Sequence, residues 1–265
     1  LLGLVGSEMC IRDRLNIFIE QKIDFQSEKI DLTPGVAITH FSDVSTRLNY
    51  QSNFFNNLFF YPGMDLGYRV NQNLKLYSNI GYTYRIPTYT DLFYSSPTTL
   101  GNENLKLEKA LTKEFGLKYL KNNFNLSMSL YQRDASDIID YVKNNEADPW
   151  QASNIREIIT NGFEFSMGYK FYLGAFRPQS INIGYSNIND DLLETDFAFS
   201  RYALNSLKNQ ITATYMFQVR DFISSTISFK NSKRLNDEGY TLIDFRTSYI
   251  YDKFTISVTV SYTHL

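Results

Sequence analysis

Residues 74–86 read LKLYSNIGYTYRI, and this stretch decides the fold class. Leu74, Leu76 and Ile80 fall on even positions, whereas Lys75 and Asn79 fall on odd ones. Successive side chains of a β-strand point to opposite faces, so this alternation predicts a strand with one apolar and one polar face. The stretch is longer than the usual globular strand of ~5–6 residues. It is long enough to cross a bilayer at a tilt, which takes ~9–11 residues.

The same alternation recurs along the chain and predicts about twelve strands. We place them near 15–24, 30–41, 56–70, 74–86, 110–120, 124–141, 154–172, 180–189, 207–218, 221–232, 239–251 and 254–259. Short turns are expected at 71–73, 121–123, 218–221 and 251–253, and long polar links at 42–55, 87–109, 142–153, 190–206 and 233–238. Short turns at one end and long loops at the other are typical of outer-membrane barrels.

Alternation by itself fits two architectures. In a soluble sandwich the apolar faces of two sheets meet inside, whereas in a membrane barrel the apolar face meets lipid and the polar face lines the lumen. Strand length, loop asymmetry and aromatic residues near strand ends favour the barrel. The prediction is therefore an all-β protein, an antiparallel transmembrane β-barrel, with about twelve strands in this chain.

The composition limits the classes of function. A formal net charge of −2 offers no basic excess for a nucleic-acid partner. No stretch approaches the ~20 apolar residues of a membrane helix. Outside the terminal segments the chain has no cysteine and one histidine, His40, and no glycine-rich phosphate loop follows a strand. These features predict that the protein is not an enzyme and carries no cofactor.

The two ends of the chain look like sequencing adapter rather than protein. Residues 9–14 can be encoded by ATGTGTATAAGAGACAG, and the reverse complement of that DNA translates as VSYTH, the sequence of residues 260–264. Two protein ends that are reverse complements are hard to explain biologically. We therefore expect residues 1–14 and 260–265 to be adapter-derived and residues 15–259 to form the barrel fragment.

Four motifs resemble TonB-dependent receptor barrels. Tyr84-Arg85-Ile86-Pro87-Thr88, followed by Asp91-Leu92-Phe93-Tyr94, is similar to the family's arginine–x–proline stretch. The segment 101–108, GNENLKLE, resembles "GNPNLKPE", with Glu103 and Leu107 in place of the prolines. Residues 161–164, NGFE, and 240–244, YTLID, resemble later strands of these barrels. The order and spacing match the family across nearly the whole of 15–259.

The resemblance implies a receptor in the outer membrane of a Gram-negative bacterium. Such receptors actively take up a bulky, scarce nutrient of the cobalamin, iron–siderophore or haem class. The implied partners are outer-membrane lipid, a small-molecule or metal-chelate ligand, and the TonB complex, reached through an N-terminal plug and TonB box that this fragment lacks. The family barrel has about twenty-two strands, so the resemblance implies a partial barrel, about twelve strands of a larger barrel, with no plug domain. The alternatives are a passive porin-like channel and a surface-structural β protein.

The external loops are the expected place for ligand contacts, because a rigid barrel holds variable loops. The candidate ligand-binding residues are Tyr89, Asp91, Tyr94, Asn102, Asp148, Trp150, Arg201 and Tyr202. The residues expected to face the lumen are Asp65, Arg69, Arg85, Glu114, Lys118 and Glu164. Arg85 is expected to pair with Glu108 or Glu114 and to anchor a loop.

A metal site has weaker support. Asp190 and Asp191, with Glu194 and Asp196 nearby, are the best candidates, since hard cations such as calcium favour clustered carboxylates. Their spacing matches no calcium-binding loop.

Overall fold

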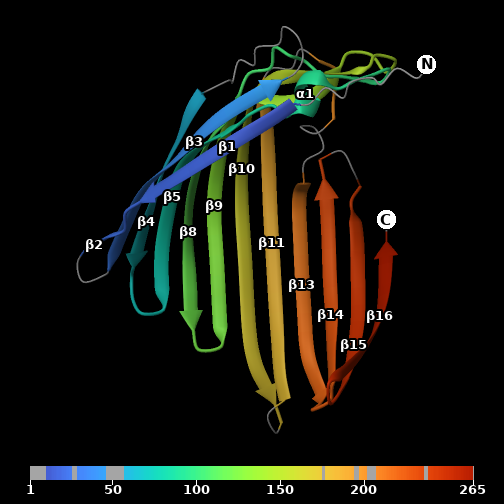
Figure 1. Cartoon of the computed structure of the whole chain (residues 1–265). Helices are drawn as coiled ribbons and strands as arrows, with labels where there is room; N and C mark the ends of the chain where they lie inside the picture. The colour runs from blue at the N-terminus through green and yellow to red at the C-terminus, as the bar shows by residue number, and fades with distance from the viewer. Residues whose placement is uncertain are drawn as a thin grey trace.

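One curved antiparallel sheet dominates the computed structural model, which describes residues 10–25, 29–45, 57–174, 177–193, 197–201, 207–235 and 238–264. Its strands follow the order β1-β3-β4-β5-β8-β9-β10-β11-β13-β14-β15-β16 (Figure 1). Their bounds are β1 Cys10–Glu20, β3 Ile30–Ser45, β4 Asn57–Arg69, β5 Leu74–Arg85, β8 Glu108–Lys121, β9 Phe124–Lys143, β10 Trp150–Leu173, β11 Arg177–Leu193, β13 Leu207–Arg220, β14 Ile223–Arg234, β15 Tyr240–Tyr251 and β16 Phe254–His264. This up-and-down order confirms the predicted all-β antiparallel architecture of about twelve long strands.

Tight turns join the strands at one end of the sheet. Asn122 and Asp252 adopt positive φ angles of 50° and 49° in the turns after β8 and β15. Asn and Asp tolerate this left-handed conformation better than most residues, so these hairpins form where the sequence predicts them. Residues 10–14 continue β1 along β3, and residues 260–264 continue β16 along β15. The adapter origin of both segments stays a prediction.

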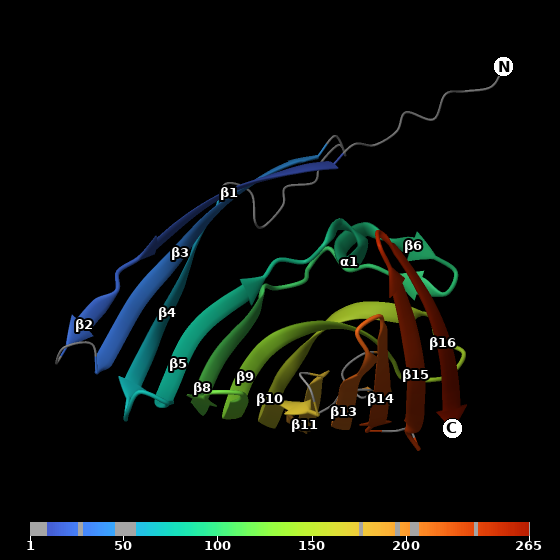
Figure 2. The same ribbon diagram turned by 90° about the horizontal axis from the view of Figure 1, so that it is seen from below.

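The two faces of the sheet differ in chemistry. Residues paired directly across the strands share a face, and Asp65, Asn79 and Glu114 form one such row. Figure 2 shows α1 on the concave side of the sheet. Arg85, which shares its face of β5 with Asn79, contacts Asp91 of α1, so the polar face is the concave one. Large apolar side chains are exposed on the convex face, among them Phe115 at 54% and Leu130 at 59%. No second sheet covers them in the described part of the chain, which rules out a sandwich here.

A belt of side-chain amides crosses the convex face where its continuous apolar band ends. Beyond the belt, Asp134 and Glu157 are interspersed with Leu111 and Ile159. The members of the belt are Gln132, Asn161, Asn187, Asn209 and Asn231. Gln132 donates a hydrogen bond to Asn161 at 3.1 Å, Asn187 donates to Asn209 at 2.6 Å, and Asn231 donates to Thr241 at 2.9 Å. The belt therefore limits the apolar band on the side opposite the tight turns.

The hairpin of β9 and β10 extends beyond its neighbours and carries added elements. The link 87–109, expected to be a plain loop, contains the helix α1 Tyr89–Phe93 and the short strands β6 Ser95–Ser96 and β7 Thr99–Leu100. β7 pairs in parallel with the start of β10, and β12 Phe199–Ser200 pairs with the end of β9. A further short strand, β2 Ile23–Phe25, pairs with β3. Among the described residues, no helix is long and apolar enough to cross a membrane.

Candidate functional site

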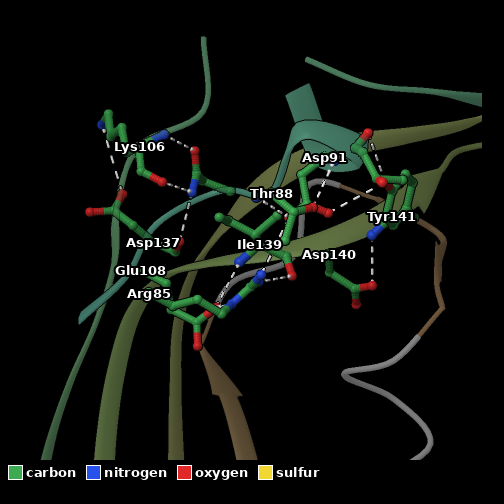
Figure 3. A network of polar contacts seen from close by, with 11 residues as sticks. Arg85, Thr88, Asp91, Lys106, Glu108, Asp137, Ile139, Asp140 and Tyr141 are labelled. Atoms are coloured by element: carbon green, nitrogen blue, oxygen red, sulfur yellow. Dashed lines mark hydrogen bonds and ion pairs between the residues drawn. The ribbon is translucent and has the colours of Figure 1, made fainter. Parts of the chain in front are cut away.

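Three charged side chains, Arg85, Glu108 and Arg133, join the two ends of the segment 87–109, and we call them the clasp (Figure 3). Arg85, at the end of β5, donates from Nε to Glu108 at 2.8 Å, and Arg133 on β9 donates to the other oxygen of Glu108 at 3.3 Å. Arg85 also donates to the carbonyl of Ile139 at 3.1 Å. Glu108 is thus the partner of Arg85, whereas Glu114 accepts hydrogen bonds from Tyr77 at 2.9 Å and Asn79 at 3.1 Å.

Asp91 fixes the start of α1. Thr88 and Asp91 form a reciprocal capping box, in which the Asp91 amide donates to the Thr88 hydroxyl at 3.1 Å and the Thr88 amide donates to the Asp91 carboxylate at 2.9 Å. Such a box satisfies two amides that the helix leaves without partners. Arg85 lies 3.4 Å from the same carboxylate, and the Tyr141 hydroxyl donates to its other oxygen at 3.4 Å. Asp91 therefore helps to hold the segment in place.

Apolar packing seats the segment on the concave side of the β9–β10 hairpin. Leu92 and Leu105, each only 2% exposed, pack with Ile139, Tyr141 and Ala152. A second cluster joins Ile86 and Leu107 to Phe41 and Phe59. Fully burying one such side chain stabilises a fold by about 1.5–3 kcal/mol, so the two clusters make this segment a folded part of the site rather than a variable loop.

The segment encloses one side of a cavity of about 810 Å³. Three candidate ligand-binding residues, Asp91, Tyr94 and Arg201, line it together with Arg85 and Tyr141. Thr90, Thr98 and Thr99 add polar groups to the wall. The volume lies within the ~300–1,000 Å³ of small-molecule sites. The cavity can therefore hold a bulky ligand between charged, hydroxyl and aromatic groups.

Trp150 and Arg201 hold the described residues 197–201 against the hairpin. The guanidinium of Arg201 lies 5.6 Å from the ring centroid of Trp150 and 6.0 Å from that of Tyr141, within cation–π range. The ammonium of Lys143 lies 4.9 Å from the same Trp150 ring, which also packs against the Leu92–Leu105 cluster. The Trp150 ring thus makes contacts within the protein. Of this group, Tyr141 and Arg201 line the cavity, whereas Trp150 and Lys143 do not.

The remaining candidate ligand residues lie apart from the cavity lining. Tyr89 stacks on Phe93 at 6.0 Å between ring centroids. Asn102 donates to the carbonyl of Ala152 at 3.1 Å, and Asp148 accepts two hydrogen bonds from Asn145 at 2.9 Å. These contacts give Asn102 and Asp148 structural roles in the turns that carry them. Tyr202 lies outside the described residues.

The residues predicted to face the lumen share the concave face. Residues directly opposite each other on neighbouring strands lie on the same face. Glu164, Ser129 and Gly116 form one such row, and Lys118, Lys75 and Arg69 form another. Arg85 and Asp65 belong to the same face through their partners Glu108 and Asn79. A separate hollow of about 360 Å³ on this wall is lined by Glu114, Lys118 and Glu164, among others. The carboxylates of Glu114 and Glu164 border one shared recess.

The predicted metal pair does not converge. Asp190 is opposite Thr160 and accepts its hydroxyl hydrogen bond, whereas Asp191 is opposite Ile159. Adjacent residues of a strand point to opposite faces, so these two carboxylates cannot share an ion while β11 stays regular. Among the described residues, no group of three or more His, Cys, Asp or Glu side chains could hold a metal. Glu194 and Asp196 lie outside the described residues. The metal site therefore stays a prediction, which the described part of β11 does not support.

Sequence reasoning missed Tyr141 and the threonines of the cavity wall. Tyr141 lies inside a long strand, where nothing in the pattern separates it from other alternating aromatics. Thr90, Thr98 and Thr99 belong to a segment whose backbone path depends on tertiary contacts. A usable signal existed only for Thr88, since Thr88 followed by Asp91 is a recognisable capping pattern.

Gly101 is expected to be intolerant of even one added methyl group. A Cβ there would lie 2.7 Å from the carbonyl carbon and oxygen of Leu92 and 2.9 Å from the amide of Phe93. Backbone cannot rotate away as a side chain does, so Gly101→Ala should cost about 1–3 kcal/mol in local stability. The measurement is the rate of tryptic cleavage after Lys106 in the folded protein, which should rise about tenfold or more.

Gly81→Ala is the matched control for this measurement. An added Cβ at Gly81 meets nothing within 4 Å. This variant should keep the wild-type cleavage rate. Equal rates for the Gly101→Ala variant and wild type would show that Gly101 does not contact the end of α1 as described.

Comparison with known proteins agrees with this geometry. The family model described as "TonB dependent receptor-like, beta-barrel" matches residues 11–261. The vitamin B12 transporter BtuB of Photobacterium profundum is 24% identical over 190 residues, 69% of this chain and 30% of that transporter. BtuB of Vibrio vulnificus is 22% identical over 192 residues, 70% of this chain and 29% of that protein. The chain thus spans less than a third of these relatives.

Two solved structures show the same fold at low sequence identity. The copper transporter OprC superposes with a TM-score of 0.69 at 17% identity, covering 94% of this chain and 41% of that one. The siderophore receptor PirA from Acinetobacter baumannii gives a TM-score of 0.66 at 14% identity, with coverages of 94% and 41%. The match of the family model to nearly the whole chain shows that this chain belongs to the TonB-dependent receptor family, as part of its β-barrel.

Proposed function

We propose that this chain forms part of an outer-membrane receptor that actively takes up a bulky, scarce nutrient. The observation that carries the proposal is the cavity of about 810 Å³ on the concave side of the sheet, enclosed by a folded external segment. A receptor needs such a preformed recess at the end of the barrel where its ligand arrives. Asp91, Tyr94 and Arg201 are the proposed ligand-side residues, and Arg85 anchors the segment.

The convex face supports a location in the outer membrane of a Gram-negative bacterium. Its exposed apolar residues would meet lipid, and the amide belt of Gln132, Asn161, Asn187, Asn209 and Asn231 would lie at the level of the headgroups. Barrels of this kind present an apolar band bounded by polar or aromatic rows. The belt lies on the loop side of the band, so the cavity would open towards the exterior.

Cobalamin is the first substrate to test, and ferric siderophores are the second. The sequence relatives are named as vitamin B12 transporters, and the structural neighbours include a siderophore receptor and a copper transporter. Haem remains within the proposed class. All of these matched proteins are named as transporters or receptors, which accords with a protein that is not an enzyme and keeps no cofactor.

The concave wall supports an interaction with a plug domain and, through it, with the TonB complex. Glu114, Glu164 and Asp65 make part of this wall acidic. A plug surface that carries arginine or lysine would pair with these carboxylates inside the lumen. Such contacts would hold the plug while its TonB box remains available to the energised complex.

Growth of a cobalamin auxotroph lacking its own receptor tests the function. The open reading frame that contains this chain should restore growth at nanomolar cobalamin, and the rescue should vanish when the TonB gene is deleted. Rescue of iron-limited growth by a ferric siderophore would move the substrate to the second class. Uptake that persists without TonB would instead indicate a passive porin-like channel, and absence of any uptake would favour a surface-structural protein.

We also propose that residues 1–14 and 260–265 come from sequencing adapter and that 15–259 is receptor sequence. The reverse-complement relation of their possible codons supports this. Trimming the source reads and translating outward from Leu15 and Thr259 tests it. If 9–14 and 260–265 persist in trimmed reads, the adapter origin is wrong.

A further inference from the structure

The carboxylates that line the cavity are already neutralised by arginines. Glu108 receives hydrogen bonds from Arg85 at 2.8 Å and Arg133 at 3.3 Å. Asp91 is held by Arg85 at 3.4 Å, by the Thr88 amide at 2.9 Å and by the Tyr141 hydroxyl at 3.4 Å. Two arginines thus balance two carboxylates. The lining contributes no uncompensated negative charge through these residues.

Arg201 adds a positive charge that is not paired with either of these two carboxylates. Its backbone amide donates to the carbonyl of Tyr141 at 3.0 Å, which fixes the position of its Cα beside the cavity. Its guanidinium lies against the rings of Tyr141 and Trp150, and no carboxylate pairs with it in the part of the chain that the structure describes. A guanidinium has five N–H donors, and contact with aromatic faces leaves the donors at its edge for other partners.

The wall around Arg201 suits an oxygen-rich ligand group. Tyr94, which is 49% exposed, lines the same cavity, as do Thr90, Thr98 and Thr99. A cationic group entering here would meet a surplus guanidinium without a free carboxylate to offset it. An anionic group would gain charge-assisted hydrogen bonds, which are roughly twice as strong as neutral ones.

We propose that Arg201 is a specificity-determining residue that binds an anionic oxygen group of the ligand in this cavity. The inference rests on the proposed receptor function and deepens it by assigning the charge of the ligand. The group is a phosphate, carboxylate or catecholate oxygen. Two kinds of ligand carry such anionic oxygens: a cobalamin, through its phosphodiester, and a ferric catecholate, through its catecholate oxygens.

Equilibrium binding to the purified product of the complete reading frame tests the proposal. The probes are cyanocobalamin, which carries a phosphodiester, a ferric tris-catecholate of net charge −3, and a neutral ferric tris-hydroxamate. Wild type should bind one of the two anion-bearing probes more tightly than the neutral chelate. Arg201→Gln should weaken that binding about ten- to a hundredfold, and Arg201→Lys should weaken it less, because charge is kept while the planar fork is lost.

Arg220→Gln is the matched control, since Arg220 is an exposed arginine at the turn end of β13. This variant should bind as wild type does. Unchanged affinity of the Arg201→Gln variant, or preference of wild type for the neutral chelate, would overturn the anion assignment while leaving the receptor function standing. Failure of wild type to bind any probe would overturn the anion assignment and count against the proposed function as well.

Discussion

Glu108→Ala is expected to release the segment 87–109 from the concave wall. Glu108 has a side chain only 12% exposed and serves both Arg85 and Arg133. Its removal leaves two like charges side by side and also removes the acceptor for the Ile139 amide, at 3.4 Å. Loss of one partner of a buried charge pair costs several kcal/mol. The arginines are about 40% exposed, at 43% and 39%, and solvent screening reduces the expected cost to about 2–3 kcal/mol.

Hydrogen exchange measured by mass spectrometry over residues 88–105 would show this release. The amides of Tyr94 and Gly101 donate to carbonyls within the segment, so their exchange reports its opening. A local loss of about 2–3 kcal/mol corresponds to exchange roughly 30- to 150-fold faster. Peptides from β13 and β14 should keep their wild-type rates, because no residue of the clasp lies on those strands.

Lys106→Ala is the matched control in the same motif. Lys106 pairs with Asp137 at 3.8 Å, and its side chain is 75% exposed. An exposed pair of this kind contributes about 0–1 kcal/mol. Exchange over 88–105 should therefore change at most severalfold. If the Glu108→Ala variant behaves like the Lys106→Ala variant, the clasp does not hold the segment.

The strands were predictable because the same physical rule acts at every position. A sheet with one face in an apolar medium and one in a polar lumen must alternate along each strand, so residues 74–86 reveal both the element and its faces. The turns at Asn122 and Asp252 were equally predictable, because few residue types other than glycine, asparagine and aspartate adopt a positive φ. Strand ends were less certain: β9 and β10 extend to Lys143 and from Trp150 into a link that looked like loop.

The interior of the segment 87–109 was not predictable from its own residues. Its helix α1 has only five residues. Isolated helices of that length are unstable in water, so α1 depends on packing against Ile139 and Tyr141, more than thirty residues away. Asp190 and Asp191 are separated for a related reason. Residues that are adjacent in the sequence are close along the chain, but in a β-strand their side chains point to opposite faces of the sheet.

The two motifs that most resemble the receptor family are halves of one structure. Arg85 and Ile86 come from the first motif, and Glu108 and Leu107 come from the second. Arg85 pairs with Glu108, and Ile86 packs in the same cluster as Leu107. Leu107, which departs from the family's proline, thus contributes to apolar packing. The spacing between the two motifs corresponds to the folded segment between them, which contains α1, β6 and β7 and whose two ends the clasp joins.

The largest effect on the whole sheet is expected from Met128→Arg. Met128 lies on the convex face of β9, opposite Leu117 and Phe165 and midway between Phe124 at the turn and Gln132 in the amide belt. In the proposed outer-membrane location, an arginine near the middle of the apolar band would sit in the hydrocarbon of the bilayer. There it costs about 2–4 kcal/mol in barrels of this type. Urea titration of the complete receptor folded in phospholipid vesicles should show this loss in the free energy of unfolding.

Ser127→Arg is the control that makes this test specific to the face. Ser127 is the preceding residue of β9, at nearly the same depth, and lines the polar hollow that also contains Glu114 and Glu164. The new guanidinium would lie on the concave face opposite Lys118, in the hollow that Glu114 and Glu164 also line. Repulsion from the lysine and attraction to the carboxylates offset each other in this exposed site, so the unfolding free energy should change by less than about 1 kcal/mol. The same arginine one residue apart should therefore cost far less stability. Equal losses for the two variants would mean that the convex face is not in lipid, and greater loss for Ser127→Arg would mean that the faces are assigned the wrong way round.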